Sequence, residues 1–182
     1  MEFIQNKMKK ALILTGPKVQ DHEFIYPYYR VQEEGFEVTV ATEDGKETLG
    51  ILGTKIPVDV SVEEVNPDDF DLLILPGGAK AMEYMRQNQK ILDIISDWNQ
   101  KGKVIAGICH AAQLLISANI VKGRRISGYY SIKDDINNAD ATYINAPFVT
   151  DNNIITSPHY KHLGPWMKES FKVYSAKNDT NN

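Results

Sequence analysis

The chain has 182 residues, of which 42% are hydrophobic and 24% charged, and its formal net charge is −4 at pH 7. This length predicts one domain with a sizeable core. The acidic balance and the lack of a basic stripe predict no nucleic-acid partner, and the apolar runs are too short to span a bilayer. With one cysteine, neither an internal disulfide nor a cysteine-rich zinc site is possible.

The first ten residues contain acidic and polar side chains where a signal peptide would need an apolar segment. Together with the single cysteine, this predicts a reducing, cytoplasmic location and no membrane partner. Residues 1–8 are interpreted as a short N-terminal extension.

Apolar runs alternate with helix-like stretches along the chain. In the first two thirds, the expected elements are a strand over 10–15, a helix over 22–34, a strand over 36–41, an irregular hairpin region over 46–62, a strand over 71–75, one long helix over 82–101, a strand over 104–108 and a helix over 111–119. In the last third, they are a strand over 126–129, a helix over 132–139, strands over 142–144, 148–150 and 154–157, a helix over 163–174 and a polar tail over 176–182. This alternation favours βαβ units, and hence a mainly parallel sheet with helices on both faces.

Three candidate features follow strands of the expected sheet. They are the loop after Thr15, the turn Pro76-Gly77-Gly78 and the single cysteine, Cys109. Because ligands bind beyond the carboxyl ends of parallel strands, we expect these features to meet at one edge of the sheet.

Cys109 stands between an expected strand and an expected helix, in the order Gly107-x-Cys109-x-Ala111. Small residues on both sides of a nucleophile are typical of a nucleophile elbow, a sharp strand-to-helix turn. The positive end of the helix dipole would lower the pKa of the thiol there and favour the nucleophilic thiolate. The segment alone leaves a second interpretation open, because free cysteines are commonly small buried hydrophobic residues.

Several blocks of the chain resemble one family of proteins. The blocks are Glu23-Phe-Ile-Tyr-Pro-Tyr-Tyr-Arg30, residues 65–78 ending in Leu-Pro-Gly-Gly78, Ile108-Cys-His-Ala-Ala-Gln-Leu-Leu115, residues 132–136 and Asn138-Ala139. In this order they resemble the ThiJ/PfpI superfamily of class I glutamine amidotransferase-like proteins, in particular the branch named after the intracellular protease PfpI. The resemblance implies a single domain over 9–175, a flavodoxin-like three-layer α/β sandwich with a mainly parallel sheet, and a nucleophile elbow.

The resemblance also implies roles for two candidate residues. Cys109 would be the nucleophile, and Glu23 would lie beside it, carrying a proton and hydrogen-bonded to the sulfur. A carboxyl buried near a thiolate has a raised pKa and can act as a general acid/base near neutral pH. Taken without the resemblance, Glu23 is interpreted as a solvated carboxylate that the dipole of its helix favours.

Further roles are implied around the thiol. The backbone N–H groups of Gly77 and Gly78, with that of His110, would form an oxyanion hole, because glycine lets amides approach a substrate oxygen closely; the alternative is a plain turn. Tyr129 would lie near the thiol, but it also suits a strand aromatic in the core. His110 is either a member of a Cys-His-Glu triad, completed by Glu83 of a neighbouring subunit, or a simple partner at a helix N-terminus.

His159 and His162 depart from the family pattern, which has Ser-Arg and Pro-x-Asp before the last helix. Substrate contacts at that rim are therefore left open. Two histidines three residues apart can bind a metal ion, but no carboxylate accompanies them in the motif, so no metal is predicted. No Gly-x-Gly-x-x-Gly or P-loop motif is present, and no cofactor of any kind is expected.

Three functions remain open at this point. The leading one is an enzyme acting on reactive carbonyls, of the glyoxalase III or protein deglycase type, through a Cys109 hemithioacetal with Glu23 as acid/base. The second is an intracellular cysteine peptidase, which depends on His110 to activate the thiol and to protonate the leaving amine. The third is a redox sensor or chaperone without turnover. The expected partners are a small carbonyl, glycated or peptide substrate, and further copies of the chain in a homodimer or homohexamer.

Overall fold

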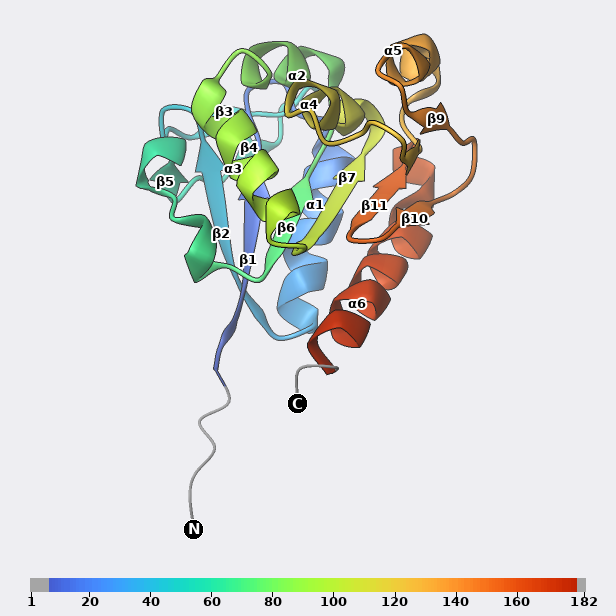
Figure 1. Cartoon of the computed structure of the whole chain (residues 1–182). Helices are drawn as coiled ribbons and strands as arrows, with labels where there is room; N and C mark the ends of the chain where they lie inside the picture. Colours follow the sequence, from blue (N-terminus) through green and yellow to red (C-terminus); the bar gives the residue numbers. More distant parts are fainter. Residues whose placement is uncertain (1–6, 180–182) are drawn as a thin grey trace.

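A seven-stranded sheet forms the middle layer of the molecule (Figure 1). The computed structural model describes residues 7–179. The strands of the sheet are β1 (Lys9–Leu14), β2 (Phe36–Thr42), β5 (Val60–Ser61), β6 (Leu72–Leu75), β7 (Val104–Ile108), β10 (Val149–Asp151) and β11 (Ile154–Ser157). They lie in the order β10-β11-β7-β6-β1-β2-β5, and all neighbours are parallel except β10 and β11. The prediction of a mainly parallel sheet is confirmed.

Helices cover both faces of this sheet, which makes the three-layer α/β sandwich that the sequence predicts (Figure 1). The helices α1 (Asp21–Glu33) and α6 (Leu163–Asp179) pack together on one face, while α2 (Ala79–Met85), α3 (Gln89–Gln100) and α4 (Ala112–Ser117) form the layer on the other. Strands β6 and β7 are buried along their whole length because both faces are covered. Within residues 7–179, none of the helices combines the length and apolar character needed to cross a membrane.

Smaller elements flank this frame. Two-stranded sheets are formed by β3 (Thr48–Leu49) with β4 (Lys55–Ile56) and by β8 (Arg125–Ile126) with β9 (Thr142–Tyr143), and α5 (Lys133–Asn138) packs beside β9. Short 3₁₀ turns are η1 (Val62–Glu64), η2 (Pro67–Asp69), η3 (Cys109–Ala111), η4 (Tyr130–Ile132) and η5 (Tyr160–His162).

The single long helix expected over 82–101 is wrong, because the segment forms two helices. α2 ends at Met85 and α3 begins at Gln89. Between them, the Asn88 side chain accepts a hydrogen bond from the N–H of Ile91 at 3.2 Å and so caps the first turn of α3. Asparagine favours such a cap over a position inside a helix. The helical spacing of apolar residues therefore continues across Asn88, although the helical backbone is interrupted there.

Two other elements end at different places from those expected. The strand expected over 126–129 stops at Ile126, and Tyr129 lies in the connection to η4, where its N–H donates to the carbonyl of Cys109. The polar tail expected over 176–182 is wrong for residues 176–179, which continue α6. Residues 180–182, and residues 1–6 of the expected N-terminal extension, lie outside the part of the chain that the structure describes.

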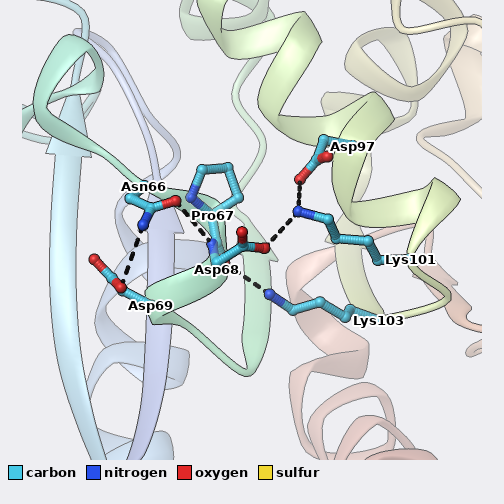
Figure 2. A network of polar contacts seen from close by, with 7 residues as sticks. All are labelled: Asn66, Pro67, Asp68, Asp69, Asp97, Lys101 and Lys103. Atoms are coloured by element: carbon cyan, nitrogen blue, oxygen red, sulfur yellow. Dashed lines mark hydrogen bonds and ion pairs between the residues drawn. The ribbon is translucent and has the colours of Figure 1, made fainter.

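A polar network ties together the amino-terminal edge of the sheet (Figure 2). Lys101, just after α3, bridges Asp68 of η2 and Asp97 of α3, the latter at 2.9 Å. The ammonium of Lys103 donates to the carbonyl of Pro67 at 2.7 Å. The turn before β6 is therefore joined to the turn before β7, at the edge opposite the carboxyl ends of these strands.

Candidate active site

Cys109 lies immediately after β7, where neighbouring parallel strands end. The last residue of β6, Leu75, pairs with Gly107, so the turn after β6 reaches the cysteine. Cys109 has a φ of +61°, a left-handed conformation that a non-glycine residue keeps only where its surroundings hold it. The chain then continues directly into η3 and α4. This is the strand-to-helix geometry of a nucleophile elbow, and the Cys109 side chain is buried.

Glu23 comes from the first turn of α1 and is 0% exposed. Its Oε2 accepts a hydrogen bond from the N–H of Gly77 at 2.8 Å. The carboxyl also interacts with the Cys109 thiol. Its Oε1 has no hydrogen-bond partner among the described residues. Burial raises the pKa of Glu23 to about 8, although the thiol and the Gly77 N–H act in the opposite direction. The carboxyl therefore keeps a proton at neutral pH next to the sulfur.

The pKa of the Cys109 thiol is raised in the structure, not lowered as the helix dipole predicts. Burial raises the pKa of this thiol, and the neighbouring Glu23 raises it further. The backbone N–H groups of Gly78 and His110 act against both effects without overcoming them. A thiolate therefore forms most easily while Glu23 keeps its proton, because an ionised carboxylate beside it would repel it.

The two glycines after β6 have different partners. The N–H of Gly77 is engaged by Glu23, so it does not face a substrate oxygen as expected from the resemblance. The N–H groups of Gly78 and His110 are directed at the sulfur instead, and this pair could receive a developing oxyanion. Gly78 has a φ of +98°, and a Cβ there would lie 2.7 Å from the backbone N of Gln20. Glycine is required because both the conformation and the space exclude a side chain.

His110 and Tyr129 stack beside the thiol. The Nδ1 of His110 lies 3.3 Å from Cys109 Sγ, and the two rings have centroids 4.7 Å apart with 25° between their planes. Tyr129 is anchored by its N–H, which donates to the carbonyl of Cys109 at 3.0 Å. Burial lowers the pKa of His110, so its ring is neutral at pH 7 and can accept a proton. The ring of Tyr129 lines the pocket and also packs against the core.

Glu83 lies elsewhere on the same chain. It is exposed on α2, where it pairs with Lys80 at 2.8 Å, and it does not line the pocket at Cys109. One chain thus brings together Cys109, Glu23 and His110 without Glu83. A contribution of Glu83 across a subunit interface stays a prediction.

A cavity of about 340 Å³ opens onto the thiol and the carboxyl. Its walls also include Gln20, Ile51, Ala79, His159 and Tyr160. From the sequence, His159 is only a departure from the family pattern, and Tyr160 gives no signal. In the structure, Ser157 pairs with Ile108, so β11 and β7 end side by side and the residues after Ser157 reach the cavity. The rule that ligands bind beyond the carboxyl ends of strands, applied also to β11, would have found them.

His159 and His162 are not brought together with a third metal ligand. Within residues 7–179, no group of three His, Cys, Asp or Glu side chains lies close enough together to hold a metal ion. The Nδ1 of His159 instead accepts the N–H of Lys161 at 3.1 Å, and His162 does not line the cavity.

The fold and the site together define an α/β sandwich protein with a cysteine on a nucleophile elbow and a buried carboxyl beside it. Comparisons with known proteins agree. The model of the DJ-1/PfpI family matches residues 9–172. A protein of Pyrococcus abyssi that is named a deglycase is 43% identical over 164 residues, which are 90% of this chain and 98% of that protein. The deglycase PfpI of Pyrococcus furiosus is 42% identical over the same shares. The chain belongs to the DJ-1/PfpI family.

Solved structures of this superfamily have the same fold. DJ-1beta of Drosophila melanogaster superimposes with a TM-score of 0.84 at 27% identity, over 93% of this chain and 90% of that one. A protein of Anabaena variabilis that contains DJ-1/ThiJ/PfpI-like and ferritin-like domains superimposes with a TM-score of 0.87 at 31% identity. That match covers 90% of this chain and 47% of the two-domain chain.

Proposed function

We propose that this chain is an enzyme that acts on reactive carbonyl compounds, as a glyoxalase or deglycase, with Cys109 as nucleophile and Glu23 as acid/base. The observation that carries the proposal is the fully buried Glu23 carboxyl, which keeps its proton beside the sulfur. When a thiolate adds to an aldehyde carbon, the aldehyde oxygen needs a proton donor, and a neutral carboxyl is one. The deglycase names of two relatives support the same class of reaction.

The proposed reaction with methylglyoxal begins with addition to the aldehyde. The thiol proton leaves to solvent, and Cys109 Sγ forms a bond to the aldehyde carbon. The Glu23 carboxyl donates its proton to the carbonyl oxygen, which gives a hemithioacetal and leaves Glu23 as a carboxylate. The Glu23 carboxylate then removes the remaining hydrogen of that carbon as a proton, and the electron pair moves toward the adjacent carbonyl, whose oxygen is protonated to give an enediol. A proton then adds to the second carbon while the hydroxyl group on the first carbon loses its proton, which gives a lactoyl thioester. Water hydrolyses this thioester to lactate and the free thiol, so one methylglyoxal and one water give one lactate.

The backbone near the thiol suits the charged stages of this sequence. Oxygen atoms bonded to the reacting carbon would lie close to the N–H groups of Gly78 and His110, which are directed at the sulfur. Fixed N–H donors stabilise a developing oxyanion without having to reorient. In a glycated substrate, the same thiol would attack the carbon that carries the adduct.

The experiment that tests this function is conversion of methylglyoxal to lactate without glutathione. The wild type should form lactate, and Cys109→Ser should abolish turnover. Glu23→Gln should lower kcat by about 100- to 10,000-fold, the usual contribution of a general acid/base. Glu63→Gln, the same change at an exposed carboxyl, is the control and should match the wild type. No lactate from the wild type, or full activity of Glu23→Gln, would contradict the proposal.

A second candidate is a cysteine peptidase, which the 3.3 Å contact between Cys109 Sγ and His110 Nδ1 favours. Peptide cleavage needs one group to accept the thiol proton and then to protonate the leaving amine, so it depends on His110. Peptide cutting that disappears in His110→Ala, with no lactate formed, would favour the peptidase. Lactate formation that survives in His110→Ala would favour the carbonyl enzyme. With neither activity, selective oxidation of Cys109 by mild peroxide, seen by mass spectrometry, would favour a sensor.

A further inference from the structure

Four rings follow one another along the wall of the cavity from the thiol outward: His110, Tyr129, His159 and Tyr160. The centroid of Tyr129 lies 4.7 Å from that of His110 and 6.0 Å from that of His159, with 25° between the planes in both pairs. The rings of His159 and Tyr160 follow at 4.0 Å and 44°. Neighbouring rings contact one another through their faces, so this part of the wall is a stack of unsaturated rings that presents ring edges to the cavity and begins at the proposed reaction centre.

The two outer rings are held in place by contacts of their own. The Nδ1 of His159 accepts the N–H of Lys161 at 3.1 Å, which puts the proton of the neutral ring on Nε2. Burial and the nearby Lys161 lower the pKa of His159, so the ring stays uncharged at pH 7. Tyr160 stacks on His22 from α1, with centroids 4.8 Å apart and 20° between the planes. Rings that are fixed before binding lose little conformational freedom when a ligand packs against their edges.

The residues that line the cavity also indicate which ligands it does not favour. Among residues 7–179, no lysine or arginine lines it, so an anionic group of a ligand finds no side-chain cation from this part of the chain. Its volume of about 340 Å³ is in the range of pockets that hold drug-sized molecules, and a three-carbon aldehyde would fill only a small part of it. His110 lies next to the thiol, whereas His159 and Tyr160 are available to contact a group beyond the reacting carbon.

We propose that His159 and Tyr160 form an aromatic subsite that favours substrates whose reacting carbon carries a flat, unsaturated, uncharged group. The subsite deepens the proposed function, and it rests on that function for the nature of the reacting carbon. The faces of the two rings are engaged by each other and by His22, so a ligand meets their edges. A ring edge carries partial positive charge and is attracted to the face of a flat unsaturated group, which a saturated ring of the same size lacks.

The subsite is tested by the rate at which two reagents alkylate Cys109. N-benzyl-iodoacetamide carries a flat ring, and N-(cyclohexylmethyl)-iodoacetamide carries a saturated ring of similar size. Since Cys109 is the only cysteine of the chain, mass spectrometry of the intact protein follows its alkylation directly. We expect the wild type to react faster with the benzyl reagent. We expect His159→Ala and Tyr160→Leu to lower the ratio of the two rates by about two- to tenfold, the range that one aromatic contact supplies.

Matched variants separate this ring contact from a general disturbance of the site. Tyr160→Phe keeps the ring and should keep the wild-type ratio. His162→Ala, a histidine of the same turn that does not line the cavity, should keep it as well. Unsubstituted iodoacetamide should alkylate every variant at the wild-type rate, which shows that the elbow remains intact. A ratio that is the same in all variants, or that falls equally in His162→Ala, would overturn the subsite.

Alkylation requires only the thiol, so this outcome does not depend on turnover. A ratio that falls as expected in a protein that makes no lactate would leave the subsite standing and reject the proposed function. Where lactate is formed, the same variants should lower kcat/KM for phenylglyoxal, which carries a flat ring, more than kcat/KM for methylglyoxal. Equal losses for the two substrates would contradict the subsite while the proposed function remained.

Discussion

Asp21 and Glu23 lie two residues apart in the first turn of α1, and both are buried, yet the pKa values of their carboxyls change in opposite directions. Burial acts to raise the pKa of Asp21, but hydrogen bonds from Leu52 and Thr54 outweigh it and the pKa falls. Glu23 receives one backbone N–H, from Gly77, and burial dominates, so its pKa rises to about 8. One helical turn therefore carries an ionised carboxylate that holds a loop and a neutral carboxyl that faces the thiol.

Glu23→Gln should stabilise the protein near neutral pH. Because the folded-state pKa of Glu23 is raised from 4.5 to about 8, its contribution to stability is fully present below 4.5 and is lost as the pH rises through about 8. Near pH 7 the buried carboxyl then costs up to about 3 kcal/mol, which the neutral amide avoids. Thermal unfolding of both proteins should show a higher Tm for the variant at neutral pH and no such gain near pH 4. A gain of equal size at both pH values would contradict the raised pKa.

Glu23→Gln should also make the thiol easier to ionise. The charge and hydrogen bond of Glu23 raise the pKa of Cys109, and the amide removes the charge. The rate of alkylation by iodoacetamide, measured against pH, should therefore rise at lower pH in the variant than in the wild type. Glu63→Gln, at an exposed position, should leave the profile unchanged. If the alkylation rate of Glu23→Gln rises at the same pH as that of the wild type, or at a higher pH, the carboxyl does not act on the thiol.

Asp21→Asn should destabilise the protein and loosen the hairpin connection beside the cavity. The Asp21 carboxylate accepts the N–H groups of Leu52 and Thr54 at 2.8 and 2.9 Å, and this loop carries Ile51 of the cavity wall. Hydrogen bonds to a charged group contribute about 1.5–3 kcal/mol each, and the amide keeps only one acceptor oxygen. Denaturant unfolding at neutral pH should show the loss. Because the pKa of Asp21 is lowered, the difference from wild type should shrink as the pH falls below its ordinary value of 3.8.

The same replacement at Asp93, which is exposed in the middle of α3, is the control for Asp21→Asn. It should change the free energy of unfolding little, because a surface carboxylate contributes little. Equal effects of the two replacements would show that Asp21 has no special structural role.

Gly78→Ala should destabilise the protein, and Gly164→Ala should not. Gly78 has a φ of +98°, and a Cβ would meet Gln20 N at 2.7 Å and Lys18 O at 2.8 Å. A strained left-handed residue alone costs about 1–3 kcal/mol. Gly164 lies in α6 with open space around its Cβ direction, so alanine there should stabilise the helix by roughly 0.5–1 kcal/mol. Denaturant unfolding of both variants measures the difference, and similar values would contradict the account of Gly78.

The fold could be predicted from the sequence because its main signals are local. Apolar runs bounded by glycine and proline gave β1, β6, β7 and β11 to within one or two residues. The elbow at Cys109 could be predicted in the same way, because a strand, a small residue and a helix former follow one another directly in the sequence. The break at Asn88 could not be predicted, because the helical spacing of apolar residues continues from α2 into α3 across the capping residue.

The sequence is therefore sufficient to locate most strands and helices and to place Cys109 on a sharp turn between a strand and a helix. The surroundings of that cysteine depend on how distant segments pack together. The pairing of Ser157 with Ile108 brings His159 and Tyr160 to the cavity, and Gly77 turns its N–H to Glu23 because two segments that lie 54 residues apart meet there. The direction in which the pKa of the Cys109 thiol shifts also depends on the tertiary structure. A helix dipole is a local property, whereas burial and the charge of a neighbouring carboxyl arise only when distant segments pack together.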